Sequence, residues 1–239
     1  MNRYKTRAEL KDLAKARLEG RYGASIVAIL SVECIQLLVS YSIALMIPGT
    51  DFLSYLISLL ISAIAAVFLG IYQTGLSLFF LKTACRQHAK ADDIFYGMHH
   101  QPTRSITVSL AITVANFVCL TPYKVLATLY LNTHQSTYLF LTLVLAILGL
   151  LIYIPVSLLL SQSYFLLLDF PDYSGTRALS ASCKVMKGHM GRLFGIQVSF
   201  LPLMLLGFLT CGIGMLWVTP YMNTTYALFF LDIMNPQKS

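Results

Sequence analysis

The sequence predicts an all-α fold: a polytopic membrane bundle of six transmembrane helices, arranged as three hairpins with amphipathic helices on the cytoplasmic side. Three observations lead to this prediction. The chain is strongly apolar, its apolar residues fall into long stretches, and its basic residues gather almost entirely on one side of those stretches. We expect residues 1–239 to form a single membrane domain.

The composition argues against an ordinary water-soluble protein. Hydrophobic residues make up 57% of the 239 residues and charged residues only 11%, whereas soluble domains carry about 25% charged residues. In a soluble protein, the net charge of +7 would suggest a nucleic-acid partner. In an apolar chain the position of the basic residues matters more than their sum, so we expect no nucleic-acid partner.

The apolar stretches are close to or beyond the roughly 20 residues needed to cross about 30 Å of hydrocarbon. They are residues 22–47, 53–81, 105–131, 138–168, 193–211 and 213–231. Pro155 interrupts the fourth stretch and favours a bent or tilted helix. Only residues 210–214, with two glycines and no charge, separate the last two. One bent re-entrant segment is therefore the alternative to two full crossings.

The basic residues predict the orientation of the chain. Sixteen of the 17 Lys and Arg residues lie before the first stretch, in the loops 82–104 and 169–192, or in the tail, and only Lys124 lies on the other side. Because cytoplasmic loops of membrane proteins are enriched in Lys and Arg, both termini are expected in the cytoplasm, and the protein in the plasma membrane. Residues 1–21 would be a cytoplasmic amphipathic helix, 22–231 the bundle and 232–239 a cytoplasmic tail.

Two segments outside the apolar stretches have the pattern of amphipathic helices. In residues 5–20, Thr6 and Glu9 form a predicted capping box ahead of one apolar face. In residues 175–191 the apolar face consists of Leu179, Cys183, Met186 and Met190. We expect both segments to lie at the headgroups, where their basic residues meet lipids, including anionic ones. A helix docked on the bundle is the alternative for the first segment.

A pattern in the chain also predicts a threefold repeat. The second, fourth and sixth stretches end in similar apolar and aromatic runs, each followed by a charged residue. Gln73 and Asn223 each lie nine residues before such a closing charge, Lys82 or Asp232. The predicted repeating unit is a short interfacial helix followed by a transmembrane hairpin.

Several motifs resemble a bacterial family of multi-pass membrane proteins catalogued as a domain of unknown function. They are LKDLAK at residues 10–15, EGRYG at 19–23, DIFYG at 93–97, ALSAS at 178–182, MKG at 186–188 and GIGMLWVTPY at 212–221. This family is distantly similar to the membrane domains attached to some glycerophosphodiester phosphodiesterases, which implies contact with lipid-related molecules. The resemblance carries no catalytic or binding residues with it.

No motif in the sequence predicts an enzyme, a cofactor or a metal site. The five cysteines are scattered, and no nucleophile elbow, Walker loop or metalloprotease motif is present. His99 and His100 form the only histidine cluster, but adjacent helical residues point about 100° apart. We therefore expect these two histidines to face lipid or a partner rather than to share a metal ion.

The candidate functional residues are polar side chains expected inside the membrane. Seven such residues are present, including Gln162 and Gln197, and the candidates selected from them are Glu33, Gln36, Gln73, Asn116 and Asn223. For all the amides among them, structural hydrogen bonding between helices is the alternative. Glu33 lies about 17 Å along its helix, near the midplane. Because a lone carboxylate is disfavoured there, we expect it to turn inward with Gln36 and to be uncharged or paired within the bundle.

Two hypotheses of function remain open from the sequence. In the first, the protein handles or transports a small or amphiphilic molecule at midplane polar residues between the hairpins. In the second, it is a non-catalytic scaffold or subunit whose cytoplasmic helices bind a partner protein or anionic lipid. An intramembrane enzyme is the least supported hypothesis because no nucleophile and base can be paired by their spacing.

Overall fold

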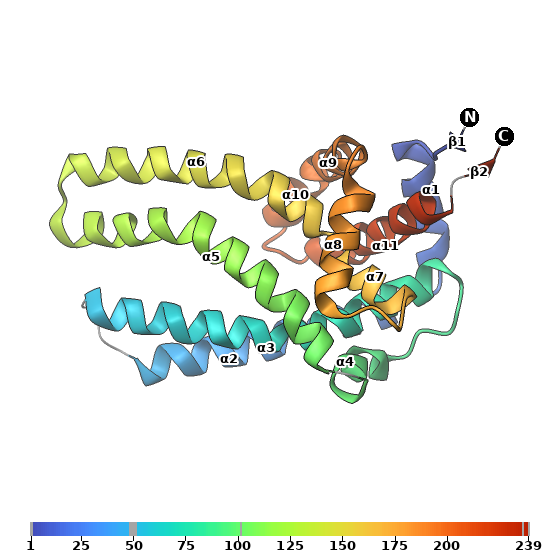
Figure 1. Cartoon of the computed structure of the whole chain (residues 1–239), viewed down its shortest axis with the longest axis horizontal. Helices are drawn as coiled ribbons and strands as arrows, with labels where there is room; N and C mark the ends of the chain where they lie inside the picture. Colours follow the sequence, from blue (N-terminus) through green and yellow to red (C-terminus); the bar gives the residue numbers. More distant parts are fainter. Residues whose placement is uncertain (1, 48–51, 101, 236, 239) are drawn as a thin grey trace.

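The computed structural model describes residues 2–47, 52–100, 102–235 and 237–238. Almost all of them are helical, and the chain runs through two long pairs of helices before a third, shorter pair (Figure 1). A two-residue antiparallel ladder between β1 (Asn2–Arg3) and β2 (Gln237–Lys238) joins the two ends of the chain. Of the predicted tail 232–239, positions 236 and 239 lie outside the described residues.

The first two pairs form the elongated half of the molecule. The first consists of α2 (Tyr22–Met46) and α3 (Phe52–Ala84), and the second of α5 (Pro102–Thr133) and α6 (Ser136–Leu160). Their far ends lie together at the left of Figure 1. A turn at Ser161 and Gln162 then bends the fourth stretch and begins α7 (Ser163–Asp169). Pro155, at which the sequence predicted a bend or tilt, lies inside the continuous α6, and the turn comes only after that helix ends.

The remaining helices lie around the other half. The short helices η1 (Ala91–Phe95) and α4 (Tyr96–His99) connect α3 to α5. After α7, the chain forms α8 (Gly175–Met186), α9 (Met190–Val198), α10 (Leu201–Leu209) and α11 (Met215–Met234). Each helix pair therefore follows a short helical segment, which is the order that the predicted repeat requires.

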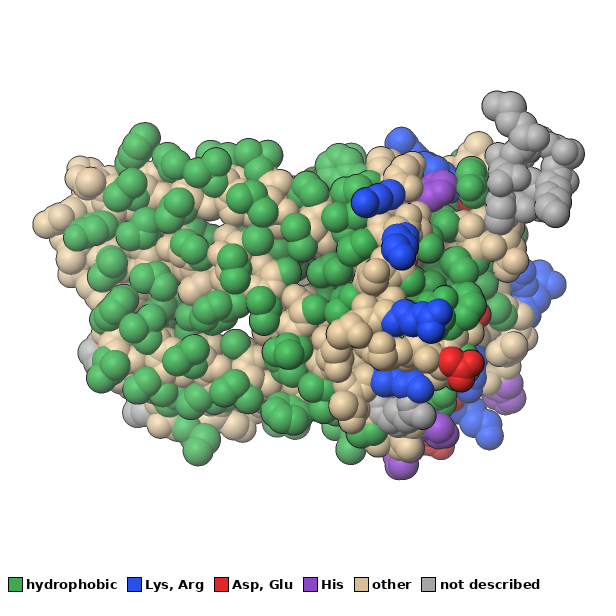
Figure 2. All heavy atoms as spheres, viewed as in Figure 1, with side chains coloured by type: hydrophobic (Ala, Val, Ile, Leu, Met, Phe, Trp, Pro, Cys, Tyr) green, Lys and Arg blue, Asp and Glu red, His purple; other side chains and the backbone are tan. Residues whose placement is uncertain are grey.

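Five helical segments are long and apolar enough to cross a membrane: Tyr22–Met46, Phe52–Ala84, Pro102–Thr133, Ser136–Asp169 and Met190–Leu209. Their outward side chains are apolar and strongly exposed, as at Leu38 and Phe140, each 67% exposed. In Figure 2, hydrophobic side chains cover one half of the visible face and the charged side chains gather on the other half. These features fit a membrane protein.

The third helix pair differs from the prediction of six full crossings, because α11 is not among the five segments. Polar residues such as Asn223 and Asp232 lower its hydropathy, and α10 has only nine residues after the chain bends at Ser199 and Phe200. The reversal at 210–214 lies near the middle of the molecule, far from the ends of the first two pairs (Figure 1). The described part of the chain thus has five candidate crossings where the sequence predicted six, and the hydropathy of α11 does not add a sixth.

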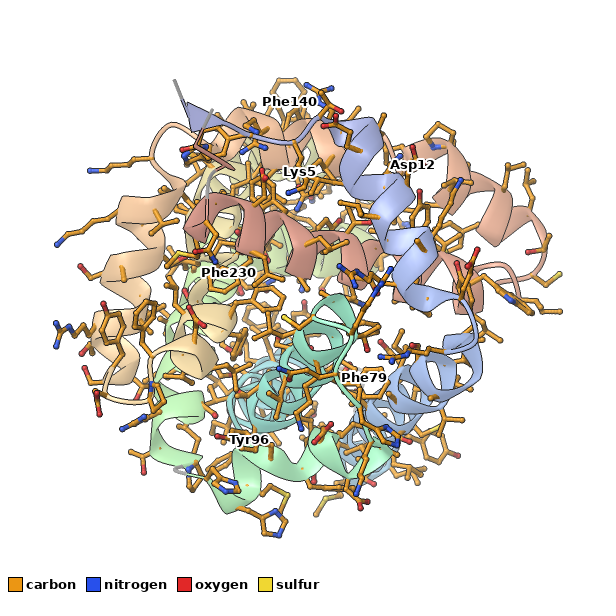
Figure 3. All side chains as sticks on the ribbon, turned by 90° about the vertical axis from the view of Figure 1, so that its right-hand side faces the viewer. Lys5, Asp12, Phe79, Tyr96, Phe140 and Phe230 are labelled. Atoms are coloured by element: carbon orange, nitrogen blue, oxygen red, sulfur yellow. The ribbon has the colours of Figure 1, made fainter. Side chains whose placement is uncertain are left out.

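The tightest core lies in the charged half, at the inner ends of the long helices. Phe79, Phe80, Phe229 and Phe230 are all at most 1% exposed, and Phe79 and Phe230 lie inside the ring of helices in Figure 3. The rings of Phe165 and Phe230 stack with centroids 5.4 Å apart. The aromatic runs that suggested a repeat therefore serve as packing residues between helices.

The helix α1 (Arg7–Leu18) docks on the bundle instead of lying apart from it. Its predicted capping box is present, with the Thr6 hydroxyl accepting from the Glu9 amide and Glu9 accepting from the Thr6 amide. Leu10, Ala14 and Leu18 are buried, and α1 packs against α11. The docked-helix alternative thus describes this segment.

The helix α8 also packs its inner face on the bundle. Ala178, Ser182 and Met186 are buried, and the Ser182 hydroxyl donates to the Leu159 carbonyl at 2.6 Å. This face is turned slightly from the predicted one, so that Leu179 and Cys183 lie at its edge and are only partly buried. Lys184 and the other basic residues of the segment stay exposed.

Gly75 allows α3 to approach η1 at backbone distance, since a Cβ atom at this position would overlap the carbonyl group of Ile94. We expect Gly75→Ala to lower the free energy of unfolding by about 1–3 kcal/mol, because the backbone cannot yield as a side chain could. Gly23→Ala is the matched control: it lies in α2 with nothing near the added Cβ and should change stability by less than about 1 kcal/mol. Equal effects of the two substitutions on denaturation in detergent would contradict the close approach.

Candidate functional site: polar cavities between the helices

A central cavity of about 160 Å³ lies where the fourth stretch bends. Its polar walls come from four parts of the chain: Gln73 on α3, Gln162 at the bend, Gln197 on α9 and Asn223 on α11. Asn223 uses its amide nitrogen to donate to the Thr219 carbonyl at 3.1 Å. Amide side chains that are distant in sequence therefore converge on one enclosed space.

Gln162 lines the central cavity and is buried there. It is 1% exposed, and its amide nitrogen donates to the Ser161 hydroxyl at 2.9 Å. Its carbonyl oxygen accepts no hydrogen bond from the described part of the chain. A buried acceptor without a partner costs about 1–3 kcal/mol, so this oxygen favours a donor inside the cavity.

A middle cavity of about 480 Å³ lies between α2, α3 and α5. Gln36 and Gln73 are among its walls, together with Ser109 and Tyr164. The Ser109 hydroxyl donates to the Ala66 carbonyl at 3.2 Å and so connects α5 to α3. Gln73 and Tyr164 also line the central cavity, so the two spaces share a wall.

An outer cavity of about 280 Å³ lies between α3 and α5. Asn116 and Lys124 line it, and the Asn116 amide nitrogen donates to the Tyr153 hydroxyl at 3.3 Å. Its remaining walls include Ser62 and Thr113, which it shares with the middle cavity. The three cavities thus follow one another along the long helices, with polar groups in each.

Glu33 is the one candidate that this series of cavities does not include. Its side chain is exposed on α2, and it is absent from the walls of all three cavities. Gln36, one turn further, is partly buried and lines the middle cavity. Residues three apart on a helix differ by about 60° in direction, so one can face inward while the other lies outside.

The cavities also contain residues that were not among the selected candidates. Tyr164 lines two of them, and Gln162 and Gln197, which the sequence placed inside the membrane, line the central one. Lys124 could have been found from the sequence, because it is the one basic residue expected on the outer side. The role of Tyr164 depends on the turn at Ser161 and Gln162, which has no distinctive sequence signal.

A polar cluster at the charged end of the molecule connects the N-terminal and C-terminal parts of the chain. Asp232 on α11 is 3% exposed and accepts from Arg192 at 2.7 Å and from the backbone amide of Lys5 at 3.2 Å. Burial lowers the pKa of the neighbouring His189; Arg192 lowers it further and Asp232 opposes this change. His189 is therefore biased toward its neutral form.

The described residues do not form a metal site: no group of three His, Cys, Asp or Glu side chains comes together among them. The five cysteines are all free thiols. The cavities can form hydrogen bonds with a ligand, because amide, hydroxyl and phenol groups line them between the apolar helices.

These features define a helical protein whose long apolar segments fit a membrane protein, with polar cavities between the helices. The chain belongs to the family described as protein of unknown function (DUF975), whose model matches residues 1–237. No curated protein and no solved structure is significantly similar to the chain. The predicted membership of a family of unknown function is confirmed, whereas the similarity to phosphodiesterase membrane domains has no support from these comparisons.

Proposed function

We propose that this protein is a non-enzymatic, multi-pass protein of the plasma membrane that takes a small or amphiphilic molecule into the series of polar cavities. Both termini would lie in the cytoplasm, since the basic residues gather at the end of the molecule that holds them. The observation that carries the proposal is the placement of Gln36, Gln73, Asn116 and Asn223 around three cavities that share walls.

The size and chemistry of the cavities support this kind of ligand. The middle cavity, at about 480 Å³, is within the range of small-molecule sites, about 300–1,000 Å³. Apolar residues such as Leu69 and Ile112 alternate with amides and hydroxyls on its walls. A molecule with a polar group and a short apolar part would satisfy both kinds of wall. In the adjoining central cavity, a donor group would satisfy the unpartnered oxygen of Gln162.

Cysteine accessibility tests whether water and polar solutes reach the cavities. In a variant whose five native cysteines are replaced by alanine, we expect Gln73→Cys and Asn116→Cys to react with a charged, membrane-impermeant methanethiosulfonate. Ile64→Cys is the control on α3, because Ile64 is 60% exposed on the apolar surface. Thiols in apolar surroundings ionise poorly, so Ile64→Cys should react at least about tenfold more slowly. Equal rates at the three positions would contradict the proposal.

Mass spectrometry of the purified protein tests whether the cavities hold a ligand. Wild-type protein extracted from its native membrane should retain a small amphiphile, and Gln73→Leu with Asn223→Leu should retain much less of it. Liposomes containing the protein alone would then be assayed for passage of the recovered molecule. A dry interior with no retained molecule in the wild-type protein would count against this function.

A scaffold role is the second candidate, and the exposed basic residues of the α8 segment support it. Arg177, Lys184 and Lys187 all project from the surface while the opposite face of α8 packs on the bundle. Such a surface suits anionic lipid or an acidic partner protein. Co-purification of a stoichiometric partner protein, lost on changing these residues to Gln, would favour this role over the first.

A further inference from the structure

We propose that a separate cavity beside α4 binds the phosphate group of an anionic phospholipid. This cavity has a volume of about 340 Å³ and lies apart from the series described above, sharing none of its lining residues. Its polar walls are Thr74, Tyr96, His99, His100, Arg104 and Ser105. The site therefore goes beyond the proposed function and does not depend on it.

The cavity presents a positive charge with no opposing carboxylate. Arg104 provides the charge, and among the described residues that line the cavity there is no Asp or Glu. Asp93, on the neighbouring η1, already pairs with Lys82 at 2.6 Å. Arg104 uses Nη1 to donate to the Pro171 carbonyl, which fixes the guanidinium while its other N–H groups remain for a phosphate.

The two histidines are held in place by the short helices. The His100 ring stacks on the Tyr96 ring with centroids 4.3 Å apart and an angle of 10° between the planes. The Nδ1 atom of His99 is 3.0 Å from the Phe95 carbonyl. Tyr96 is labelled in Figure 3, where it lies on the short green helix at the rim of the bundle. The side chains are thus arranged before any ligand binds, which lowers the entropic cost of binding.

The position of the cavity favours a lipid as the source of the phosphate. Arg104 lies in the first turn of α5, where the charged half of the molecule meets one of the long apolar helices. Phe95 and Met98, on the adjoining short helices, are 38% and 48% exposed. Leu167 and Leu168 form the apolar side of the cavity. A phosphate at Arg104 would leave room for acyl chains along these apolar side chains.

Lipid retention tests the site on the full-length protein. Protein reconstituted in nanodiscs of phosphatidylcholine and phosphatidylglycerol is released into mild detergent, and the bound phosphatidylglycerol is counted by native mass spectrometry. We expect Arg104→Gln to weaken retention by about tenfold or more, since a charge-assisted hydrogen bond is lost. Arg86→Gln is the matched control, because it removes the same charge from an exposed position after α3 that belongs to neither this cavity nor the α8 surface.

A second variant and a second ligand distinguish the possible causes of weaker lipid retention. His100→Ala leaves the bond from Arg104 to Pro171 in place and should also weaken retention, so that misfolding of Arg104→Gln cannot alone explain the result. Titration with inorganic phosphate separates the two sources: binding of phosphate in wild type that is lost in Arg104→Gln, without retained lipid, would support the site but assign it to a soluble phosphate. Equal retention in wild type and Arg104→Gln would overturn the proposal. An equal loss in Arg86→Gln would overturn it as well, because general surface charge would then explain the binding.

Discussion

Asp232→Asn is expected to lower the free energy of unfolding by about 3 kcal/mol, the lower end of the range for a broken buried ion pair. The substitution keeps the shape of the side chain but leaves Arg192 without its counter-charge. The lower end applies because the side chains of Lys5 and Arg192 remain 30% and 27% exposed, so water compensates part of the loss. Denaturant titration of the protein in mild detergent would measure the change.

Asp12→Asn is the control for this prediction. Asp12 is exposed on α1, and removing its charge should change the free energy of unfolding by no more than about 0.5 kcal/mol. The protein with Asp232→Asn should also release its N-terminal segment, which proteolysis before α1 would detect. If both substitutions had the same small effect, the contacts of Asp232 with Lys5 and Arg192 would not contribute to the free energy of unfolding.

Phe230→Ala is expected to cost about 3–5 kcal/mol, the range found for large buried aromatic side chains. Phe230 is 0% exposed and stacks on Phe165, so its removal opens a cavity between α7 and α11. Helices on both sides are fixed by other buried phenylalanines, including Phe229, and cannot easily collapse into the space. The same denaturant titration would measure this loss.

Phe140→Ala supplies the comparison within the apolar half. Phe140 is 67% exposed on α6 and faces away from the other helices (Figure 3). Because its surroundings differ little between folded and unfolded protein in detergent, the substitution should change stability by less than about 0.5 kcal/mol. A large effect there would mean that another chain covers this surface.

Part of the candidate site could be predicted from the sequence, because the depth of a residue in the membrane and its position in a repeat both follow from its place along the chain. Gln73 and Asn223 lie nine residues before the closing charges of their helices, and the structure brings them to the same central cavity. Asn116 was selected for its depth and Gln36 because it shares a helix face with Glu33, and each lines a cavity. The helical class and the five long apolar segments likewise follow from hydropathy.

The direction in which a side chain points was harder to predict. Glu33 was expected to turn inward with Gln36, but the structure leaves it exposed, because the hydrophobic pattern of α2 has no clear polar face to set its rotation. The extent of the third helix pair was also not predictable, since its 39 residues could form two crossings or a shorter loop. The position of α11 depends on its contacts with α1 and α3, and those contacts are non-local.

The docking of α1 on α11 has a consequence for biosynthesis. The backbone amide of Lys5 meets the carboxylate of Asp232, 227 residues further along the chain, so α1 pairs with a helix that is synthesised much later. At about 5–20 residues per second, translation of the intervening residues takes about 10–50 s. Throughout that time the apolar face of α1, with Leu10, Ala14 and Leu18, has no α11 to cover it. The bundle can close only after α11 has been made, and a nascent chain truncated before α11 would present that face to chaperones and proteases.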